Sequence, residues 1–505
     1  MRPVADGGHT VPTSDLLEEL PERTLQGEVP ARVSGVSADS RRVSAGECFV
    51  AVTGFKENGR RFIPDALSRG AAMIVAEPPD PLPEERVLRV LVPAARPALA
   101  TLASAYHGHP SRALTVVGIT GTNGKTTTSY LCEALLGAGG GLTGVIGTIQ
   151  YRIGAETVGA GQTTPEAVEL QALLARMRQA SVAGVAMEVS SHALALHRVD
   201  GIDFDVAIFT NLTQDHLDFH GTFDEYRRAK RRLFEQLEAS SKKGRTAVVN
   251  TDDLAGVSMV AGLDLPTVTF GLGRAAMVRP REFSSTLAGI RMRVETPRGS
   301  VEVRSPLVGE HNVLNLLGAV GCGVALGLPP VVIGEALARV SVVAGRFERV
   351  DAGQPFLVIV DYAHTPDALE RVLATARALT AGRLGVVFGC GGDRDRAKRP
   401  IMGEIAARLA DRVWVTSDNP RSERPETIID EIVAGIRGVS PDAGRHATMP
   451  ERQGAIQDAL LWARAGDCVV IAGKGHETYQ LVGSAVLPFD DRKVAREILS
   501  RRRSA

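Results

Sequence analysis

Short apolar runs rich in β-branched residues alternate with segments of helical period along most of the chain. In the middle of the chain, strand-like runs cover residues 115–117, 182–189, 204–210 and 246–250, and a helical pattern covers residues 166–180. Strands that alternate with helices predict right-handed βαβ units and a mainly parallel sheet. Polar motifs follow several of these runs, so we expect active residues at the carboxyl ends of the strands.

The same alternation on either side of this region predicts two further α/β domains. The earlier one has strand-like runs at residues 33–37, 48–52 and 72–76 and a helix near residues 62–69. The later one has strand-like runs at residues 356–360, 384–388, 412–416 and 468–472, with amphipathic helices at residues 366–379 and 400–409.

The predicted fold class is therefore α/β with three domains. They are a small N-terminal α/β domain over residues 26–110, a central domain with a mainly parallel sheet over residues 111–342, and a Rossmann-like domain over residues 343–505. Residues 1–25 have no clear period and are rich in Gly, Pro, Thr and acidic residues. We expect them to form a flexible N-terminus.

Composition excludes several classes of protein. At 505 residues the chain is too long for a single core, and its 44% hydrophobic and 23% charged residues are typical of a soluble globular protein. Basic and acidic residues are equal at 58 each and aromatics make up 4%, which disfavours a nucleic-acid partner. Five widely spaced cysteines indicate neither a zinc site nor a disulfide framework. No secretion signal or long apolar run is present, so we expect a cytoplasmic protein without membrane insertion.

A glycine-rich turn after the strand at residues 115–117 carries the clearest chemical signal. Gly121 and Gly124 let backbone N–H groups approach an anion, and the helix that follows adds its positive dipole end. Lys125 is expected to reach terminal phosphates and the Thr126 hydroxyl to bind Mg²⁺. The phosphate-loop consensus has glycine where Ile119 stands, but the flanking strand and helix favour nucleotide binding over a chance match.

Other motifs each permit a structural interpretation when taken alone. Glu188 follows a strand and could join Thr126 as an oxygen ligand of Mg²⁺, or could be a charge at a helix N-terminus. His216 could be a packed polar residue, and no third nitrogen or sulfur ligand is spaced for zinc. Residues 226–234, with four Arg and one Lys, are typical of a solvated helix face. Residues 163–166 are also a good helix start.

The motif Asp-Asn-Pro-Arg at residues 418–421 has two interpretations. Pro420 fixes the backbone, Asn419 supplies an amide, and Arg421 supplies a planar double donor suited to a carboxylate. A free amino acid with a distal carboxylate needs such a fork. The alternative is an ordinary Asp-Asn-Pro turn.

Taken in order, the motifs resemble those of the Mur ligases, which are ATP-dependent ligases of peptidoglycan precursors. The resemblance covers about residues 30–495 and includes TGTNGKTT (120–127), TTPE (163–166), MEVSSHAL (187–194), TNLTQDHLD (210–218), HNVLN (311–315), GRFE (345–348) and DYAHTPD (361–367). The motifs DNPR (418–421) and GKGHE (473–477) are similar to those of the branch that adds the third peptide residue.

This resemblance implies a reaction and its partners. The expected cofactors are ATP and Mg²⁺, and the expected substrates are UDP-N-acetylmuramoyl-L-alanyl-D-glutamate and meso-diaminopimelate, joined through an acyl phosphate by a monomeric enzyme. Alternatives are the same reaction with L-lysine or another diamino acid, a folylpolyglutamate synthetase-like ligase, and a non-catalytic nucleotide-binding protein. Arg421 argues against L-lysine, whose distal ammonium it would repel.

The resemblance also assigns candidate residues to each part of the site. The catalytic candidates are Lys125, Glu188, His216 and Lys230. The ATP candidates are Gly121, Thr122, Asn123, Gly124, Lys125, Thr126, Thr127, Asn312, Asn315, Arg346 and Asp361. Those for the UDP-muramoyl dipeptide, starting in a UDP-binding N-terminal domain, are Ser37, Ser40, Thr163, Thr164, Ser190, His192 and Arg198. Those for diaminopimelate, in the C-terminal domain, are Arg394, Asp418, Asn419, Pro420, Arg421, Gly473 and Glu477.

The implied metal ligands include a modified lysine. They are Thr126, Glu188, His216 and Lys230, the last as a carbamate (N6-carboxylysine). We expect the arginines around Lys230 to favour the carbamate anion, and Glu477 to receive an ammonium group of the amino acid. Two departures from the family pattern are Asn58, where Asp is frequent, and Leu196, where many relatives have Gln.

Overall fold

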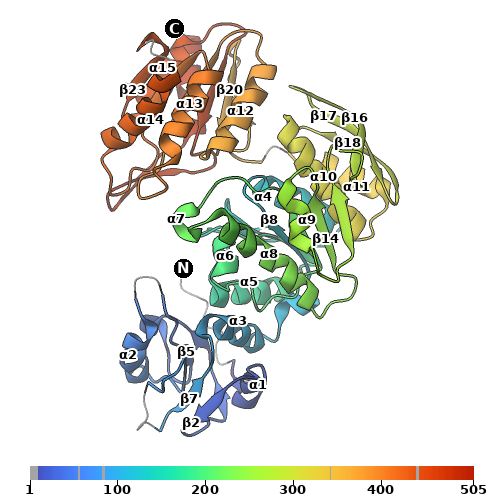
Figure 1. The fold of residues 1–505 in the computed structure, drawn as a ribbon, viewed down its shortest axis with the longest axis vertical. Helices are drawn as coiled ribbons and strands as arrows, with labels where there is room; N and C mark the ends of the chain where they lie inside the picture. The colour runs from blue at the N-terminus through green and yellow to red at the C-terminus, as the bar shows by residue number, and fades with distance from the viewer. Residues whose placement is uncertain (1–8, 55–56, 82–85, 342, 440–442, 505) are drawn as a thin grey trace.

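Three α/β lobes follow one another along the chain in the computed structural model (Figure 1). The structure describes residues 9–54, 57–81, 86–341, 343–439 and 443–504. The predicted α/β class is confirmed.

The N-terminal lobe is built on a five-stranded sheet in the order β2-β7-β6-β5-β4. Strands β4 to β7 run parallel and β2 is antiparallel to β7. The strands are β2 (Thr24–Gln26), β4 (Val36–Ser37), β5 (Cys48–Val50), β6 (Met73–Ala76) and β7 (Leu88–Leu91), and the helices are α2 (Ile63–Ser68) and α3 (Ala95–Tyr106). The expected strand at residues 33–37 is broken, because Val33 pairs instead with Val11.

The prediction of a flexible segment at residues 1–25 is wrong for residues 11–20. Strands β1 (Val11–Pro12) and β3 (Arg32–Val33) pair antiparallel, and helix α1 (Thr13–Glu18) packs on α3. Leu16, Leu17 and Leu20 are buried in the core of the lobe. Three leucines within five positions were too short a pattern to show a helical period. Residues 1–8 lie outside the described part of the chain.

The central lobe contains an eight-stranded sheet in the order β11-β10-β9-β12-β8-β13-β14-β15. From β9 to β15 the neighbours are parallel, as predicted, and β10 and β11 form an antiparallel edge. The strands are β8 (Thr115–Thr120), β9 (Thr143–Ile146), β10 (Tyr151–Ile153), β11 (Glu156–Val158), β12 (Gly184–Glu188), β13 (Val206–Phe209), β14 (Thr246–Asn250) and β15 (Thr267–Phe270).

Helices cover both faces of this sheet because both faces are apolar. Val116 and Val185 face one core, whereas their neighbours Val117 and Ala186 face the other. The helices are α4 (Lys125–Leu136), α5 (Ala167–Gln179), α6 (Ser191–Ala195), α7 (Leu217–His220), α8 (Phe223–Ala239), α9 (Leu254–Val260), α10 (Glu310–Ala325) and α11 (Pro330–Ala338). A three-stranded antiparallel sheet that we did not predict packs against α11: β16 (Arg279–Thr286), β17 (Gly289–Thr296) and β18 (Gly299–Ser305).

The C-terminal lobe has a six-stranded sheet in the order β19-β20-β24-β21-β22-β23, parallel except for β19. Its strands are β19 (Glu348–Arg349), β20 (Leu357–Asp361), β21 (Leu384–Phe388), β22 (Arg412–Thr416), β23 (His446–Met449) and β24 (Cys468–Ala472), with a hairpin of β25 (Tyr479–Val482) and β26 (Ala485–Pro488). Its helices are α12 (Pro366–Ala378), α13 (Lys398–Leu409), α14 (Pro425–Val439), α15 (Arg452–Trp462) and α16 (Asp491–Ser504). The four predicted strands are confirmed; the missed ones are short or partly exposed.

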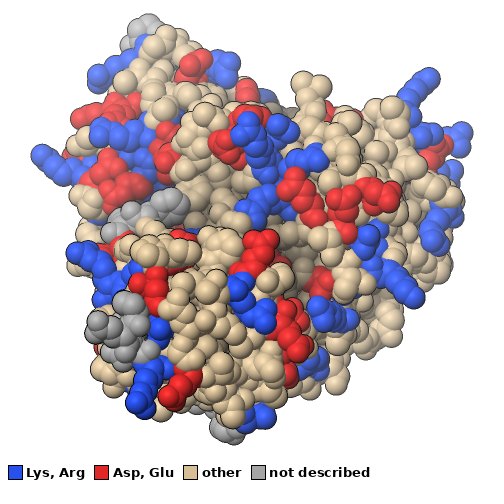
Figure 2. Space-filling model, turned by 60° about the horizontal axis from the view of Figure 1, so that its bottom comes forward, with Lys and Arg blue, Asp and Glu red and all other residues tan. Residues whose placement is uncertain are grey.

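Surface charge and cysteine placement agree with the composition. Figure 2 shows basic and acidic side chains interspersed on one face of the molecule. All five cysteines are buried and none forms a disulfide. In the described part of the chain, no helix is both long enough and apolar enough to cross a membrane.

Candidate active site

The phosphate loop connects β8 to α4 and cannot accommodate larger residues at two positions. Gly121 has φ 148° and Gly124 has φ 86°. A Cβ atom at Gly121 would come within 1.9 Å of Thr210 Oγ1, and one at Gly124 within 2.3 Å of Asn315 Oδ1. The backbone conformation and the close neighbours therefore both require glycine.

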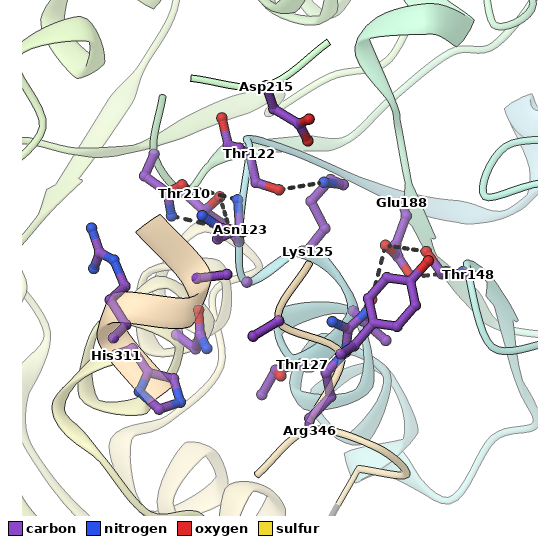
Figure 3. Close-up of a pocket in the computed structure, with 18 of the residues that line it drawn as sticks. Thr122, Asn123, Lys125, Thr127, Thr148, Glu188, Thr210, Asp215, His311 and Arg346 are labelled. Carbon is purple, nitrogen blue, oxygen red and sulfur yellow. Dashed lines mark hydrogen bonds between the residues drawn. The ribbon is translucent and has the colours of Figure 1, made fainter. Parts of the chain in front are cut away.

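Lys125 begins α4 and folds back over the loop (Figure 3). Its Nζ donates to the carbonyl oxygens of Gly121 at 3.0 Å and Thr122 at 2.8 Å. Burial lowers its pKa, and the nearby carboxylates of Glu188 and Asp215 oppose this effect. An anion that enters the loop would offer this ammonium better partners than neutral carbonyl groups.

Glu188, the last residue of β12, meets Thr126, the second residue of α4. Glu188 is 1% exposed, and its Oε2 accepts hydrogen bonds from Thr126 Oγ1 at 3.1 Å and Thr148 Oγ1 at 3.0 Å. Its Oε1 accepts one from the backbone N–H of Thr148 at 2.8 Å. We did not predict Thr148; the available signal was its position just after the apolar end of β9.

Residues from the C-terminal lobe reach this cluster. Arg346 Nη2 donates to Thr126 Oγ1 at 2.7 Å, and its guanidinium lies 4.6 Å from the ring centre of Tyr362. The Asp361 carboxylate accepts the backbone N–H groups of Phe347 at 2.6 Å and Ala363 at 2.8 Å, and burial raises its pKa. Asp361 thus fixes the backbone that presents Arg346.

These residues surround a cavity of about 240 Å³ between the central and C-terminal lobes. The expected residues that line it are Thr122, Asn123, Gly124, Lys125, Thr126, Thr127, Thr163, Glu188, Ser190, His216, Asn312, Asn315, Arg346 and Asp361. Lining residues that we did not predict include Thr148, Thr210, Asn211, Asp215, Phe270, His311, Leu314, Tyr362, His364, Arg371 and Val372. The cavity is therefore polar at the loop and partly apolar beside α10 and α12.

Asn312 and Asn315 hold the α10 side of the cavity. Asn312 Nδ2 donates to Val308 O at 2.8 Å, and Asn315 Nδ2 donates to Asn312 Oδ1 at 2.9 Å. Asn315 Oδ1 in turn lies 3.5 Å from Thr128 Oγ1 on α4. The pair joins α10 to the helix of the phosphate loop.

Lys230 is buried beneath the loop, so the solvated-face interpretation is wrong for this residue. It is 1% exposed, its Nζ donates to Gly121 O at 2.7 Å, and it lies 4.4 Å from the ring centre of Tyr226. Burial and the charge of Lys125 lower its pKa.

The arginines of α8 do not surround Lys230 as expected. Arg227 and Arg228 bind Asp224, Arg231 binds Glu235, and Arg232 binds Asp200. The helical period separates these side chains from the buried face, which carries Tyr226, Lys230, Leu233, Phe234 and Leu237.

His216 lies between the phosphate loop and a small histidine cluster. Its Nε2 is 3.2 Å from Asp215 Oδ2, and its ring packs edge-on against His192 at 4.7 Å between centroids. Burial lowers the pKa of His216 to about 3, so its ring is neutral near pH 7. Within the described residues, no group of three or more His, Cys, Asp or Glu side chains is placed to hold a metal ion. Mg²⁺ does not need such a cage, because it is usually bound by one or two carboxylates together with water and phosphate oxygens; Glu188 and Thr126 fit that donor set.

The residues expected to bind the muramoyl substrate fall into two places. Thr164 Oγ1 donates to Glu188 O at 2.8 Å and accepts from Ser190 N–H at 3.1 Å. Arg198 donates to Thr164 O at 3.1 Å and pairs with Glu166 at 2.6 Å. Thr164, Arg198 and His192 lie beside the cavity without lining it.

Ser37 and Ser40 are in the N-terminal lobe and do not line this cavity either. Ser37 Oγ accepts the Asp39 N–H at 3.2 Å, and Asp39 Oδ1 accepts the Arg41 N–H at 3.1 Å. Residues 37–41 therefore form a turn that the Ser37 and Asp39 side chains stabilise.

The C-terminal candidates converge at the ends of β21, β22 and β24. Asn419 Nδ2 donates to Glu477 Oε2 at 2.9 Å, and a Cβ atom at Gly473 would come within 2.5 Å of Asp418 Oδ2. Pro420 is buried between Asn419 and Arg421. The sequence had suggested these contacts only through the resemblance, because the two motifs are more than 50 residues apart.

Two arginines, Arg394 and Arg421, add positive charge to these C-terminal candidate residues. Arg421 has φ 53° and donates to Gly392 O at 2.8 Å. Burial lowers its pKa, and the nearby Arg394 adds to that effect. The positive charges of Arg394 and Arg421 therefore favour an anion at this end of the sheet.

Lys474, which we did not predict, changes the expected role of Glu477. It is fully buried and donates to Glu477 Oε2 at 2.8 Å and Asn419 Oδ1 at 3.2 Å. Glu477 therefore already has a cationic partner from its own chain at Oε2, and its contact with the substrate ammonium stays a prediction.

Comparison with known proteins covers all three lobes. Family models match as "Mur ligase family, catalytic domain" over residues 32–107, "Mur ligase middle domain" over 119–323 and "Mur ligase, glutamate ligase domain" over 345–475. A UDP-N-acetylmuramoyl-L-alanyl-D-glutamate–2,6-diaminopimelate ligase from Solibacter usitatus (strain Ellin6076) is 46% identical over 481 residues, 95% of this chain and 96% of that protein.

Two further matches agree with these. A ligase of the same name from Geobacillus kaustophilus (strain HTA426) is 46% identical over 489 residues, 96% of this chain and 99% of that protein. A solved structure of a ligase of that name is 32% identical and aligns with a TM-score of 0.70, covering 98% of this chain and 99% of the other. With its three lobes, its phosphate loop and near full-length relatives, the chain belongs to the Mur ligase family.

Proposed function

We propose that the protein is an ATP-dependent ligase that adds meso-diaminopimelate to UDP-N-acetylmuramoyl-L-alanyl-D-glutamate. The observation that carries this proposal is the pairing of a phosphate-loop cavity with a group of two arginines and Asn419 at the adjoining strand ends. The near full-length relatives bearing that activity in their names support it.

The reaction has two steps. The free D-glutamyl carboxylate attacks the γ-phosphorus of ATP, which gives an acyl phosphate and ADP. The amine of diaminopimelate then attacks the acyl carbon, and phosphate leaves as the amide forms. The protein mainly positions the reactants and neutralises charge, with Lys125 and Arg346 at the phosphates.

Gly121 to Thr127 form the phosphate cradle, and the side of the cavity with Phe270, Leu314, Asn312 and Asn315 takes the adenine. Mg²⁺ held by Thr126 and Glu188 would neutralise phosphate oxygens. His216 and a carbamylated Lys230 would hold a second ion. Burial supports that modification, since only a neutral amine reacts with carbon dioxide and burial lowers the pKa of Lys230.

The three lobes divide the substrates among them. In this proposal, residues 26–110 hold the UDP portion through Ser37 and Ser40. The domain at residues 111–342 binds ATP and, through Thr163, Thr164, Ser190, His192 and Arg198, the muramoyl dipeptide. The domain at residues 343–505 binds the amino acid through Arg394, Asp418, Asn419, Pro420, Arg421, Gly473 and Glu477. The same reaction with L-lysine is disfavoured, because Arg394 and Arg421 would repel its distal ammonium.

Product analysis tests the proposal. The protein is incubated with ATP, Mg²⁺, the UDP-muramoyl dipeptide and one of meso-diaminopimelate, L-lysine or L-ornithine, and products are identified by mass spectrometry. We expect a tripeptide product and ADP release with meso-diaminopimelate, and no product when Lys125 is replaced by Ala. A larger yield with L-lysine would reassign the substrate, and ADP release with none of the three would contradict the ligase reaction.

A further inference from the structure

The hairpin of β25 and β26 lies against the Asp-Asn-Pro-Arg motif and has no part in the proposed mechanism. Leu481 turns both of its backbone groups toward the motif, although it follows Asn419 by 62 residues. Its N–H donates to Asn419 Oδ1 at 2.9 Å, and its carbonyl oxygen accepts from the Arg421 N–H at 3.1 Å. The side chain of Gln480 also contributes, since its Nε2 donates to Asp418 O at 2.7 Å. The hairpin is therefore hydrogen-bonded along most of the motif.

The first consequence concerns the side-chain amide of Asn419. A backbone N–H can only donate, so the amide atom that meets Leu481 is the oxygen, and this contact fixes which way the amide points. Lys474 Nζ donates to the same oxygen at 3.2 Å, which fills its second acceptor position. One amide N–H donates to Glu477 Oε2 at 2.9 Å. Among the described residues only the second N–H is left, so Asn419 can offer a substrate a donor but not an acceptor.

The second consequence concerns the backbone of Arg421. Its φ of 53° lies in the left-handed region, which is unfavourable for a residue with a side chain. The hairpin pairs with this residue on both sides: the Arg421 N–H donates to Leu481 O at 3.1 Å, and the Arg421 carbonyl oxygen accepts from the Gly483 N–H at 2.7 Å. In this conformation the guanidinium reaches Gly392 O at 2.8 Å. The hairpin thus holds the backbone from which the guanidinium is presented.

We propose that the β25–β26 hairpin positions Asn419 and Arg421 so that both present only hydrogen-bond donors to the amino-acid substrate. This inference rests on the proposed function and deepens it. A carboxylate accepts hydrogen bonds from both residues, whereas an ammonium, which can only donate, finds no acceptor on either. The hairpin therefore contributes to the choice of an amino acid with a distal carboxylate. Leu481 and Gln480 are positioning residues, because they act through the motif.

A proline at residue 481 removes the N–H that orients the amide, and the hairpin offers a matched control. Because both backbone groups of Leu481 face the motif, Leu481 and its partner Val486 form a non-hydrogen-bonded pair, and the Val486 N–H points away from β25. We expect Leu481→Pro to raise the KM for meso-diaminopimelate by about 10-fold, with kcat and the KM for ATP unchanged. The ratio of L-lysine to diaminopimelate use should rise. Val486→Pro, at an exposed position, should match wild type in steady-state kinetics.

A double-mutant cycle separates positioning from a general loosening of the lobe. In an Asn419→Ala background the hairpin N–H has no amide to orient, so Leu481→Pro should raise the KM for diaminopimelate much less than it does in wild type. Gln480→Ala gives a second variant, which leaves every backbone hydrogen bond in place. It should also raise this KM without lowering kcat, and Gln480→Lys, which keeps a donor, should restore part of the loss.

Three results would overturn the proposal. They are an unchanged KM for diaminopimelate in Leu481→Pro and Gln480→Ala, an equal rise in Val486→Pro, and full additivity of Leu481→Pro with Asn419→Ala. If Leu481→Pro does not fold, Gln480→Ala decides alone, and an unchanged KM in that variant overturns the proposal. Failure of the proposed function itself would appear in wild type, as absence of the tripeptide product with meso-diaminopimelate.

Discussion

Burial changes the chemistry of a single residue, Lys230. On a solvated helix face this lysine would be a cation, but here it lies beneath the phosphate loop with Gly121 O as its hydrogen-bond acceptor. Desolvation and the charge of Lys125 lower its pKa, which leaves a larger fraction of the amine neutral.

We predict that Lys230 is carbamylated in the active enzyme. Lys230→Ala should be nearly inactive, and a short-chain carboxylic acid should restore part of the activity by supplying the missing carboxylate. Carbon-13 NMR of protein equilibrated with labelled bicarbonate should show a carbamate signal that this variant lacks. The exposed Lys243 provides the control, since Lys243→Ala should keep both signal and activity. Full activity of Lys230→Ala without additive would remove the carbamate from the mechanism.

At the scale of elements, the ends of β21, β22 and β24 bring together the residues proposed to bind the amino acid. The residues that touch one another are supplied by three loops, and neighbouring parallel strands bring them to one edge of the sheet. Arg452 holds two of these strand ends through their backbone carbonyl groups. Its guanidinium donates to Ser417 O at 3.3 Å and to Ala472 O at 2.9 Å, the carbonyl groups just before Asp418 and Gly473.

Removing Arg421 should weaken use of diaminopimelate. A charge-assisted bidentate pair is stronger than a neutral hydrogen bond, and breaking it costs about 1.5–3 kcal/mol. At about 1.4 kcal/mol for each factor of ten, Arg421→Ala should lower kcat/KM for diaminopimelate by about 10- to 100-fold and raise the ratio of L-lysine to diaminopimelate use. Arg421→Lys should not restore it fully. Steady-state kinetics with both amino acids provides the check, with the exposed Arg424→Ala as control; an unaffected kcat/KM would place the pocket elsewhere.

The buried pair of Arg452 and Asp491 should matter for stability. Its two hydrogen bonds are 2.8 and 2.7 Å long and both side chains are fully buried, so either partner alone would be an uncompensated charge. Arg452→Met or Asp491→Asn should each lower the free energy of unfolding of the lobe by about 3–5 kcal/mol in urea titrations. The exposed pair Arg349–Asp351 is the control, and its removal should cost less than about 1 kcal/mol. Equal effects for the two pairs would contradict this account.

At the scale of the whole molecule, the central and C-terminal lobes touch around the nucleotide cavity. Asn123 of the phosphate loop donates to Asp367 of α12 at 2.7 Å, and Arg346 reaches Thr126 at 2.7 Å. Histidines lie on both sides of this contact. Burial lowers the pKa of His311 in the central lobe and of His364 in the C-terminal lobe, each to about 4.

These two histidines predict a loss of stability in mild acid. Their pKa in the unfolded chain is about 6.5, so below that pH the unfolded state binds protons that the folded state excludes. Their contribution therefore declines as the pH falls below about 6.5, and the decline ends near pH 4. We expect a lower melting temperature at pH 5.5 than at pH 7.5, and a smaller difference in His311→Gln. His9→Gln, which changes an exposed histidine, should behave as wild type; a melting temperature independent of pH across this range would contradict the prediction.

Much of the sheet architecture followed from the sequence. The strands at residues 246–250, 384–388, 412–416 and 468–472 were predicted with their observed bounds, because each is an apolar run rich in β-branched residues and nearly all of its side chains are buried. The phosphate loop was equally clear, since its glycines are required by local backbone conformation and close contacts. Signals of this kind depend on neighbours along the chain, and the sequence contains them directly.

Pairing between distant residues was decided only by the tertiary structure. The sequence could not show that Lys230 faces inward while the arginines of α8 face outward, or that Lys474 neutralises Glu477. Each depends on which strand ends and helix faces meet. Whether a charge is buried, and what it meets there, is therefore set by packing between segments far apart in the sequence, and that packing lowers the pKa of Lys230 and sets the partners of Glu477.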